Sequence, residues 1–102
     1  MRVLFDQGTP VPLRQHLAAH QVATTFEFGW NNLKNGELLQ QSEESGFSVL
    51  VTTDQNLRYQ QNLAGRKIAI VVLTTTSWPR IEREAKAVDA AAPSSYVEVP
   101  IP

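Results

Sequence analysis

Two nearly continuous apolar runs decide the fold: Phe47-Ser48-Val49-Leu50-Val51 and Ile68-Ala69-Ile70-Val71-Val72-Leu73. Both are rich in β-branched or aromatic side chains, and both are bounded by turn residues. This composition is typical of strands that are buried on both faces, and such strands belong to parallel sheets. The two runs therefore predict a parallel sheet at the centre of the molecule.

Three further segments are predicted strands, at residues 3–5, 21–25 and 96–101. The first is a short apolar run, and the last alternates polar and apolar residues, which suits an edge strand. Pro100 also fits an edge because proline has no amide hydrogen to donate to a neighbouring strand.

Helical periodicity fills the intervals between these strands. Thr9-Pro10 predicts the N-cap and first turn of one helix. Asn35-Gly36 predicts the start of a second helix, which ends at Gly46. Ser77 predicts the cap of a third, and a short helix over residues 54–61 completes the set.

Alternation of strands and helices predicts the fold class. Parallel strands need crossover connections, and the intervening helices cover the faces of the sheet. We therefore expect a single α/β domain over residues 1–102, in which three layers (α/β/α) contain a mainly parallel central sheet of four to five strands.

Composition narrows the function classes. Nine Lys and Arg against ten Asp and Glu give a formal charge of −1, so RNA binding would need a local site. The absence of Cys excludes disulfides, thiolate metal sites and Cys nucleophiles. The longest apolar run has six residues, whereas a membrane-spanning helix needs roughly 20, and the N-terminus lacks a signal-peptide pattern. We expect a cytoplasmic protein with no membrane partner.

Two acids follow predicted strands directly. Asp6 follows residues 3–5, and Asp54 follows the run that begins at Phe47. Ligands of parallel sheets bind at the carboxyl ends of the strands, so the two carboxylates are expected to share one crevice. Converging carboxylates repel each other, and a hard cation such as Mg²⁺ or Mn²⁺ relieves that repulsion. Asp54 has an alternative role as the N-cap of the helix that follows it.

Glu37 is the third candidate acid, in the first turn of the second predicted helix. Taken alone, its position favours an interaction with the helix dipole, worth about 0.3–1 kcal/mol. Together with Asp6 and Asp54 it gives three carboxylates that an α/β sheet can bring to one ion.

Three stretches resemble the small bacterial PIN-like proteins, which share a D-x-N-x-P start and a T-x-D-x-x-[FL] centre. They are the opening at residues 2–13, the segment at 35–39 and the run at 49–57. The resemblance implies a PIN-like domain and a metal-dependent ribonuclease that hydrolyses RNA phosphodiester bonds, of the kind that often serves as the toxin of a toxin–antitoxin pair. It also implies that Asp6, Glu37 and Asp54 are the catalytic, metal-binding acids.

Two positions depart from the family pattern. Gly8 stands where these relatives often have Asn, and Asn56 stands where many have a further Asp. Asn56 is thus expected to offer a neutral amide oxygen to the metal, and the number of ions, one or two Mg²⁺ or Mn²⁺, stays open. Besides RNA, the resemblance implies an antitoxin protein and a second copy of the chain as candidate partners.

Five side chains are candidate substrate contacts. Lys34 and Arg58 flank the acids in sequence, and Arg14 lies on the first predicted helix. Trp30 lies in the loop before Glu37, where it is suited to contact RNA or a partner. Thr75, after the run that ends at Leu73, is suited to hydrogen-bond a phosphate. For each cation the alternative is an ordinary solvated surface charge.

Two other function classes stay open. One is a PIN-like scaffold that no longer cleaves RNA and serves as a protein–protein interaction module. The other is a phosphorelay receiver-like domain, since receivers also carry acids after the first and third strands and a Thr or Ser after the fourth. Receivers also need a Lys after the last strand, and residues 96–102 contain none.

Overall fold

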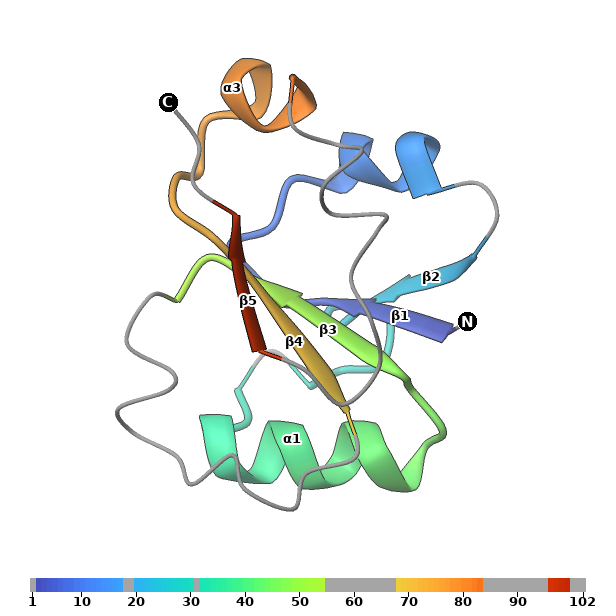
Figure 1. Cartoon of the computed structure of the whole chain (residues 1–102). Helices are drawn as coiled ribbons and strands as arrows, with labels where there is room; N and C mark the ends of the chain where they lie inside the picture. The colour runs from blue at the N-terminus through green and yellow to red at the C-terminus, as the bar shows by residue number, and fades with distance from the viewer. Residues whose placement is uncertain (1, 18–19, 31, 55–67, 84–95, 100–102) are drawn as a thin grey trace.

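A computed structural model of the chain describes residues 2–17, 20–30, 32–54, 68–83 and 96–99. Five parallel strands form one sheet in the order β2-β1-β3-β4-β5 (Figure 1). In chain order the elements are β1 (Arg2–Phe5), the 3₁₀ helix η1 (Val11–Leu17), β2 (Gln21–Thr24), α1 (Asn35–Glu44), β3 (Val49–Thr52), β4 (Ala69–Leu73), α3 (Trp78–Glu82) and β5 (Tyr96–Val99). The predicted α/β class and parallel sheet are confirmed.

The strand order places β1 between β2 and β3. Val3 pairs with Val22 of β2 on one side and with Val49 of β3 on the other. In doubly wound sheets of this order the topological switch point lies between β1 and β3, and ligands bind at the carboxyl ends of the strands there. The fold thus marks the ends of β1 and β3 as the expected place for a site.

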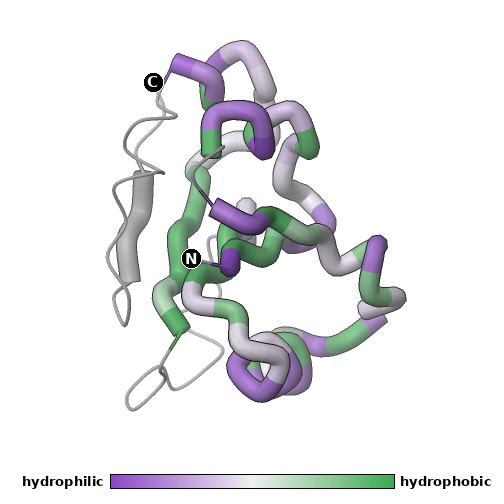
Figure 2. Tube along the Cα trace, turned by 90° about the vertical axis from the view of Figure 1, so that its right-hand side faces the viewer, coloured by the Kyte–Doolittle hydropathy of each residue, from purple (hydrophilic) through white to green (hydrophobic). Residues whose placement is uncertain are grey.

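Both faces of the sheet are covered by apolar contacts. On one face Leu13 and Leu17 of η1 and Ile81 of α3 pack on a buried cluster that includes Phe5 and Val51. On the other face Leu38 and Leu39 of α1 pack with residues that include Leu4 and Leu50. Figure 1 shows α1 on the side of the sheet opposite η1 and α3, and Figure 2 shows β1, β3 and β4 as the hydrophobic centre of the trace. Alternation of side chains along each strand supplies both clusters.

The segment after Thr9 differs from its prediction. An η1 of 3₁₀ type forms over Val11–Leu17, and the buried Thr9 hydroxyl donates to the Val51 carbonyl of β3 (2.9 Å) instead of capping the helix. Pro10 and Pro12 lack amide donors, and the Leu13 amide bonds the Pro10 carbonyl at 3₁₀ spacing (3.1 Å). The prediction that Thr9 is an N-cap is wrong because its hydroxyl has a partner across the sheet.

The two other helix starts follow the sequence more closely. The helix α1 begins at Asn35, and Gly46 has a positive φ of 84°, as expected of a glycine after a helix end. Ser77 holds the N-cap position of α3, but its side chain makes no capping bond. Among the described residues no helix is long and apolar enough to cross a membrane. The predicted helix over residues 55–61, the later part of the third helix and Pro100 lie outside the described residues.

Candidate functional site

Asp6 directly follows β1 and is fixed there by three hydrogen bonds. Its amide donates to the Val51 carbonyl of β3 (2.9 Å). One carboxylate oxygen, Oδ1, accepts from the Gln7 amide (2.7 Å), and the other, Oδ2, accepts from the Thr52 hydroxyl (2.9 Å). The half-buried Asp6 carboxylate is therefore fixed beside the end of β3.

Thr52 links the two acids of the switch point. Its side chain is 1% exposed, and its hydroxyl donates to Asp6 Oδ2 while accepting from the Asp54 amide (3.1 Å). One hydroxyl thus uses its proton on the first acid and a lone pair on the backbone of the second. Asp6 and Asp54 thus lie at the ends of neighbouring strands, but the bridge reaches the backbone of Asp54, and the shared crevice for their two carboxylates stays a prediction.

The sequence reasoning did not single out Thr52, although a signal was present. A Thr that ends a buried strand two residues before an Asp can accept a hydrogen bond from that residue's amide. What the local pattern does not give is the second partner, because Asp6 is 46 positions away in sequence.

The loop after Asp6 lies tightly against the end of β3. A Cβ atom added at Gly8 would clash with Thr53 Oγ1 unless one of the two moved. Glycine therefore suits position 8, because a side chain there requires Thr53 to move.

A hollow of about 230 Å³ opens beside Asp6, between the ends of β1 and β2. Its walls combine aromatic and aliphatic surface with hydroxyl, amide and carboxylate groups. The lining residues are Phe5, Asp6, Gln7, Thr9, Val11, Thr24, Thr25 and Phe26. Asp6 thus belongs both to this hollow and to the bridge to Asp54.

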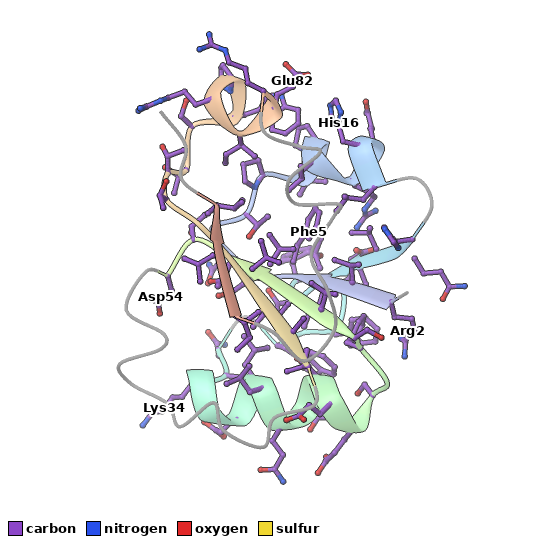
Figure 3. The ribbon with its side chains drawn as sticks, in the orientation of Figure 1. Arg2, Phe5, His16, Lys34, Asp54 and Glu82 are labelled. Carbon is purple, nitrogen blue, oxygen red and sulfur yellow. The ribbon has the colours of Figure 1, made fainter. Side chains whose placement is uncertain are left out.

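Glu37 is engaged locally at the start of α1. Its carboxylate accepts from the Lys34 amide (3.4 Å), a long bond of the capping-box type. Among the described residues no group of three or more His, Cys, Asp or Glu side chains is placed to hold a metal ion. The structure therefore does not show the expected convergence of Glu37 with Asp6 and Asp54. Figure 3 shows Asp54 and Lys34 along the same side of the molecule, Lys34 preceding α1 and Asp54 following β3.

Arg14, a predicted substrate contact, forms an ion pair with Glu27 (2.5 Å), and its Nε atom is buried with no hydrogen-bond partner among the described residues. The Arg14 guanidinium and, next, the Thr24 amide hold the pKa of Glu27 below its ordinary value. Arg14 therefore reaches the turn after β2 rather than standing free as a phosphate contact.

The other predicted substrate contacts differ in whether the structure gives them partners within the protein. Trp30 stacks on Phe28, with ring centroids 4.7 Å apart, and packs against the cluster on the α1 face. The Thr75 hydroxyl accepts from the Ser77 amide (3.1 Å), which is a local turn bond. Lys34 is exposed, and Asn56 and Arg58 lie outside the described residues.

No family model, curated protein or solved structure matches the chain. The resemblance to PIN-like proteins thus stands on the sequence motifs, and the site stands on the contacts described above.

Proposed function

We propose that this chain is a divalent-metal-dependent ribonuclease of PIN-like type, with Asp6 and Asp54 as its central acids. The observation that supports this most is the Thr52 hydroxyl, which joins Asp6 to the backbone of Asp54 at the ends of neighbouring parallel strands. Ligands of open α/β sheets bind at the switch point beyond the carboxyl ends of the strands, and Asp6 and Asp54 have that position.

The donor chemistry fits magnesium or manganese. Mg²⁺ in phosphoryl-transfer sites is commonly held by one or two protein carboxylates, with waters and substrate phosphates completing its shell. Asp6 and Asp54 supply two carboxylates, and each Asp6 oxygen keeps accepting capacity beyond the one bond that it makes. A bound ion supplies an activated water and neutralises charge on the scissile phosphate. Thr52 acts as a positioning residue by orienting Asp6.

Glu37 and Asn56 are proposed as additional metal ligands, subordinate to Asp6 and Asp54. Glu37 can reach an ion only by giving up its bond to the Lys34 amide, and at 3.4 Å that bond is weak. Substitution of Glu37 is therefore expected to reduce activity less than substitution of Asp6. The amide oxygen of Asn56 remains the proposed neutral ligand, and Lys34 remains a proposed RNA contact.

The proposed substrate and partners follow from the resemblance to PIN-like proteins. It implies a bacterial enzyme with RNA as substrate and an antitoxin protein or a second copy of the chain as partner, and the lack of a signal-peptide pattern favours the cytoplasm. The alternative function is a PIN-like module that binds a partner protein without cleaving RNA, and an RNA-cleavage experiment distinguishes it from the nuclease.

Cleavage of single-stranded RNA with Mg²⁺ or Mn²⁺ tests the proposal. The wild type is compared with Asp6→Asn, with Asp54→Asn, and with Glu44→Gln as a control for charge on the exposed face of α1. We expect cleavage by the wild type and the control and loss of cleavage in both Asp variants, with circular dichroism unchanged. Equal cleavage by all four proteins indicates a contaminant, and metal binding without cleavage points to the inactive module.

The strand order favours one second candidate. The order 2-1-3-4-5 is that of doubly wound domains that include phosphorelay receivers, and Asp54 follows β3 as the phosphorylated acid of a receiver does. Incubation with acetyl phosphate and Mg²⁺, followed by intact-mass measurement, tests this candidate. A phosphoryl adduct in the wild type that is lost in Asp54→Asn supports a receiver-like function, and an unmodified wild type removes it.

A further inference from the structure

The hollow beside Asp6 is bordered by an aromatic side chain that the fold leaves in solvent. Phe26 is 80% exposed, whereas Phe5, which also lines the hollow, is fully buried. Val11, which is 55% exposed, also lines this hollow, so two exposed apolar side chains gather there, and contiguous exposed apolar surface is a mark of a binding site.

Phe26 is presented by a well-bonded turn. The buried Thr25 amide donates to the Phe5 carbonyl (3.0 Å), and the Gly29 amide donates to the Phe26 carbonyl (3.1 Å). The Glu27 amide also donates to the Thr24 hydroxyl (3.2 Å). Because these bonds fix the backbone on both sides of Phe26, its exposure is a property of the fold and little order is lost when a ligand stacks on the ring.

The size and lining of the hollow favour one flat ring with polar edges. Its volume of about 230 Å³ is below the roughly 300–1,000 Å³ of pockets for drug-sized molecules. Phe26 and Val11 offer apolar faces, while Gln7 and Thr24 offer groups that can donate or accept hydrogen bonds along a ring edge. A nucleobase has both features.

We propose that this hollow is a nucleobase subsite, in which one base of a single-stranded RNA stacks on Phe26 and the adjoining phosphate would lie next to the divalent cation that Asp6 is proposed to hold. The proposal rests on the ribonuclease function proposed above, because Asp6 belongs to both places. Base stacking on an aromatic side chain tolerates different sequences, so Phe26 sets the position of the strand and Gln7 and Thr24 set any base preference.

Binding of a fluorescently labelled single-stranded RNA oligonucleotide to the full chain tests the subsite without requiring cleavage. The variants are Phe26→Ala, Phe26→Trp and Phe28→Ala, the last as a matched control. Phe28 is also exposed, at 43%, but it stacks on Trp30 and is not among the residues that line the hollow. Since stacking is worth about 1–3 kcal/mol per base, Phe26→Ala is expected to weaken binding roughly 5- to 150-fold. Phe26→Trp retains binding, and Phe28→Ala changes it little.

Oligonucleotides that lack one base in turn complete the test. Removal of one particular base should weaken wild-type binding and have no further effect on Phe26→Ala. Equal binding by the wild type and Phe26→Ala overturns the subsite, as does a wild type that binds no RNA. So does a change from dimer to monomer in Phe26→Ala with RNA binding unchanged, since Phe26 then belongs to an interface between copies. If RNA binding depends on Phe26 but no cleavage occurs, the subsite is supported and the ribonuclease proposal fails. If the wild type and Phe26→Ala cleave RNA equally, the ribonuclease proposal stands and the subsite fails.

Discussion

Replacement of Thr52 by Val removes the hydroxyl that links the two acids and keeps the shape of the side chain. The hydroxyl lies in a side chain that is 1% exposed and makes bonds of 2.9 Å to Asp6 Oδ2 and 3.1 Å from the Asp54 amide. A bond to a charged group contributes about 1.5–3 kcal/mol and a neutral bond about 0.5–1.5 kcal/mol. Because Asp6 and Asp54 are half-buried and can regain some water, we expect Thr52→Val to destabilise the fold by about 2–3 kcal/mol.

Urea unfolding followed by circular dichroism measures this loss, which corresponds to a fall in Tm of roughly 10–20 °C for a domain of this size. Thr52→Ser is the matched control because it keeps the hydroxyl and removes a methyl group, worth about 0.8 kcal/mol. The hydrogen-bond account predicts that Ser is tolerated better than Val. In an Asp6→Ala background the effect of Thr52→Val should shrink, since one of its two bonds is already gone. A Val variant as stable as the wild type, with a less stable Ser variant, would refute the bridge and assign Thr52 to packing.

Three further predictions concern other parts of the fold. Gly8→Ala should destabilise by about 1–3 kcal/mol in urea unfolding, and by less when Thr53→Ala removes the hydroxyl that clashes with the added carbon; equal losses in both backgrounds would contradict the close approach. The pKa of Glu27 is lowered by Arg14, so the carboxylate stabilises the fold above its ordinary pKa of 4.5, and this stabilisation is lost as pH falls through the lowered value. The Tm difference between wild type and Glu27→Gln should accordingly close on acidification, and a gap that widens would refute the pairing. Leu39→Ala, at a side chain with 0% exposure, should cost about 2–5 kcal/mol, and a loss below about 1 kcal/mol would mean that α1 is not anchored by it.

The strands were predictable because their signal is local. The apolar runs 47–51 and 68–73, which match β3 and β4 closely, are typical of strands buried on both faces, and that pattern needs no knowledge of the rest of the chain. The positions of Asp6 and Asp54 at strand ends follow from the same pattern. Boundaries shifted by a residue or two, as helix and strand ends usually do.

The contacts that build the site were harder to predict because they join distant residues. The Thr9 hydroxyl bonds Val51 and the Thr52 hydroxyl bonds Asp6, pairs separated by 42 and 46 positions in sequence. Both depend on the pairing of β1 with β3, which a local pattern does not encode. Glu37 shows the opposite case, since a short-range capping bond competes with a long-range role for the same carboxylate.

Thermal unfolding with and without Mn²⁺ tests the central claim most directly. A ligand that binds only the folded chain at 100 times its Kd stabilises it by about 2.7 kcal/mol. We predict that Mn²⁺ raises the Tm of the wild type and of Glu44→Gln, and that Asp6→Asn and Asp54→Asn each abolish the rise. An unchanged wild-type Tm across the Mn²⁺ titration, or an equal rise in both Asp variants, would contradict a metal site at the ends of β1 and β3.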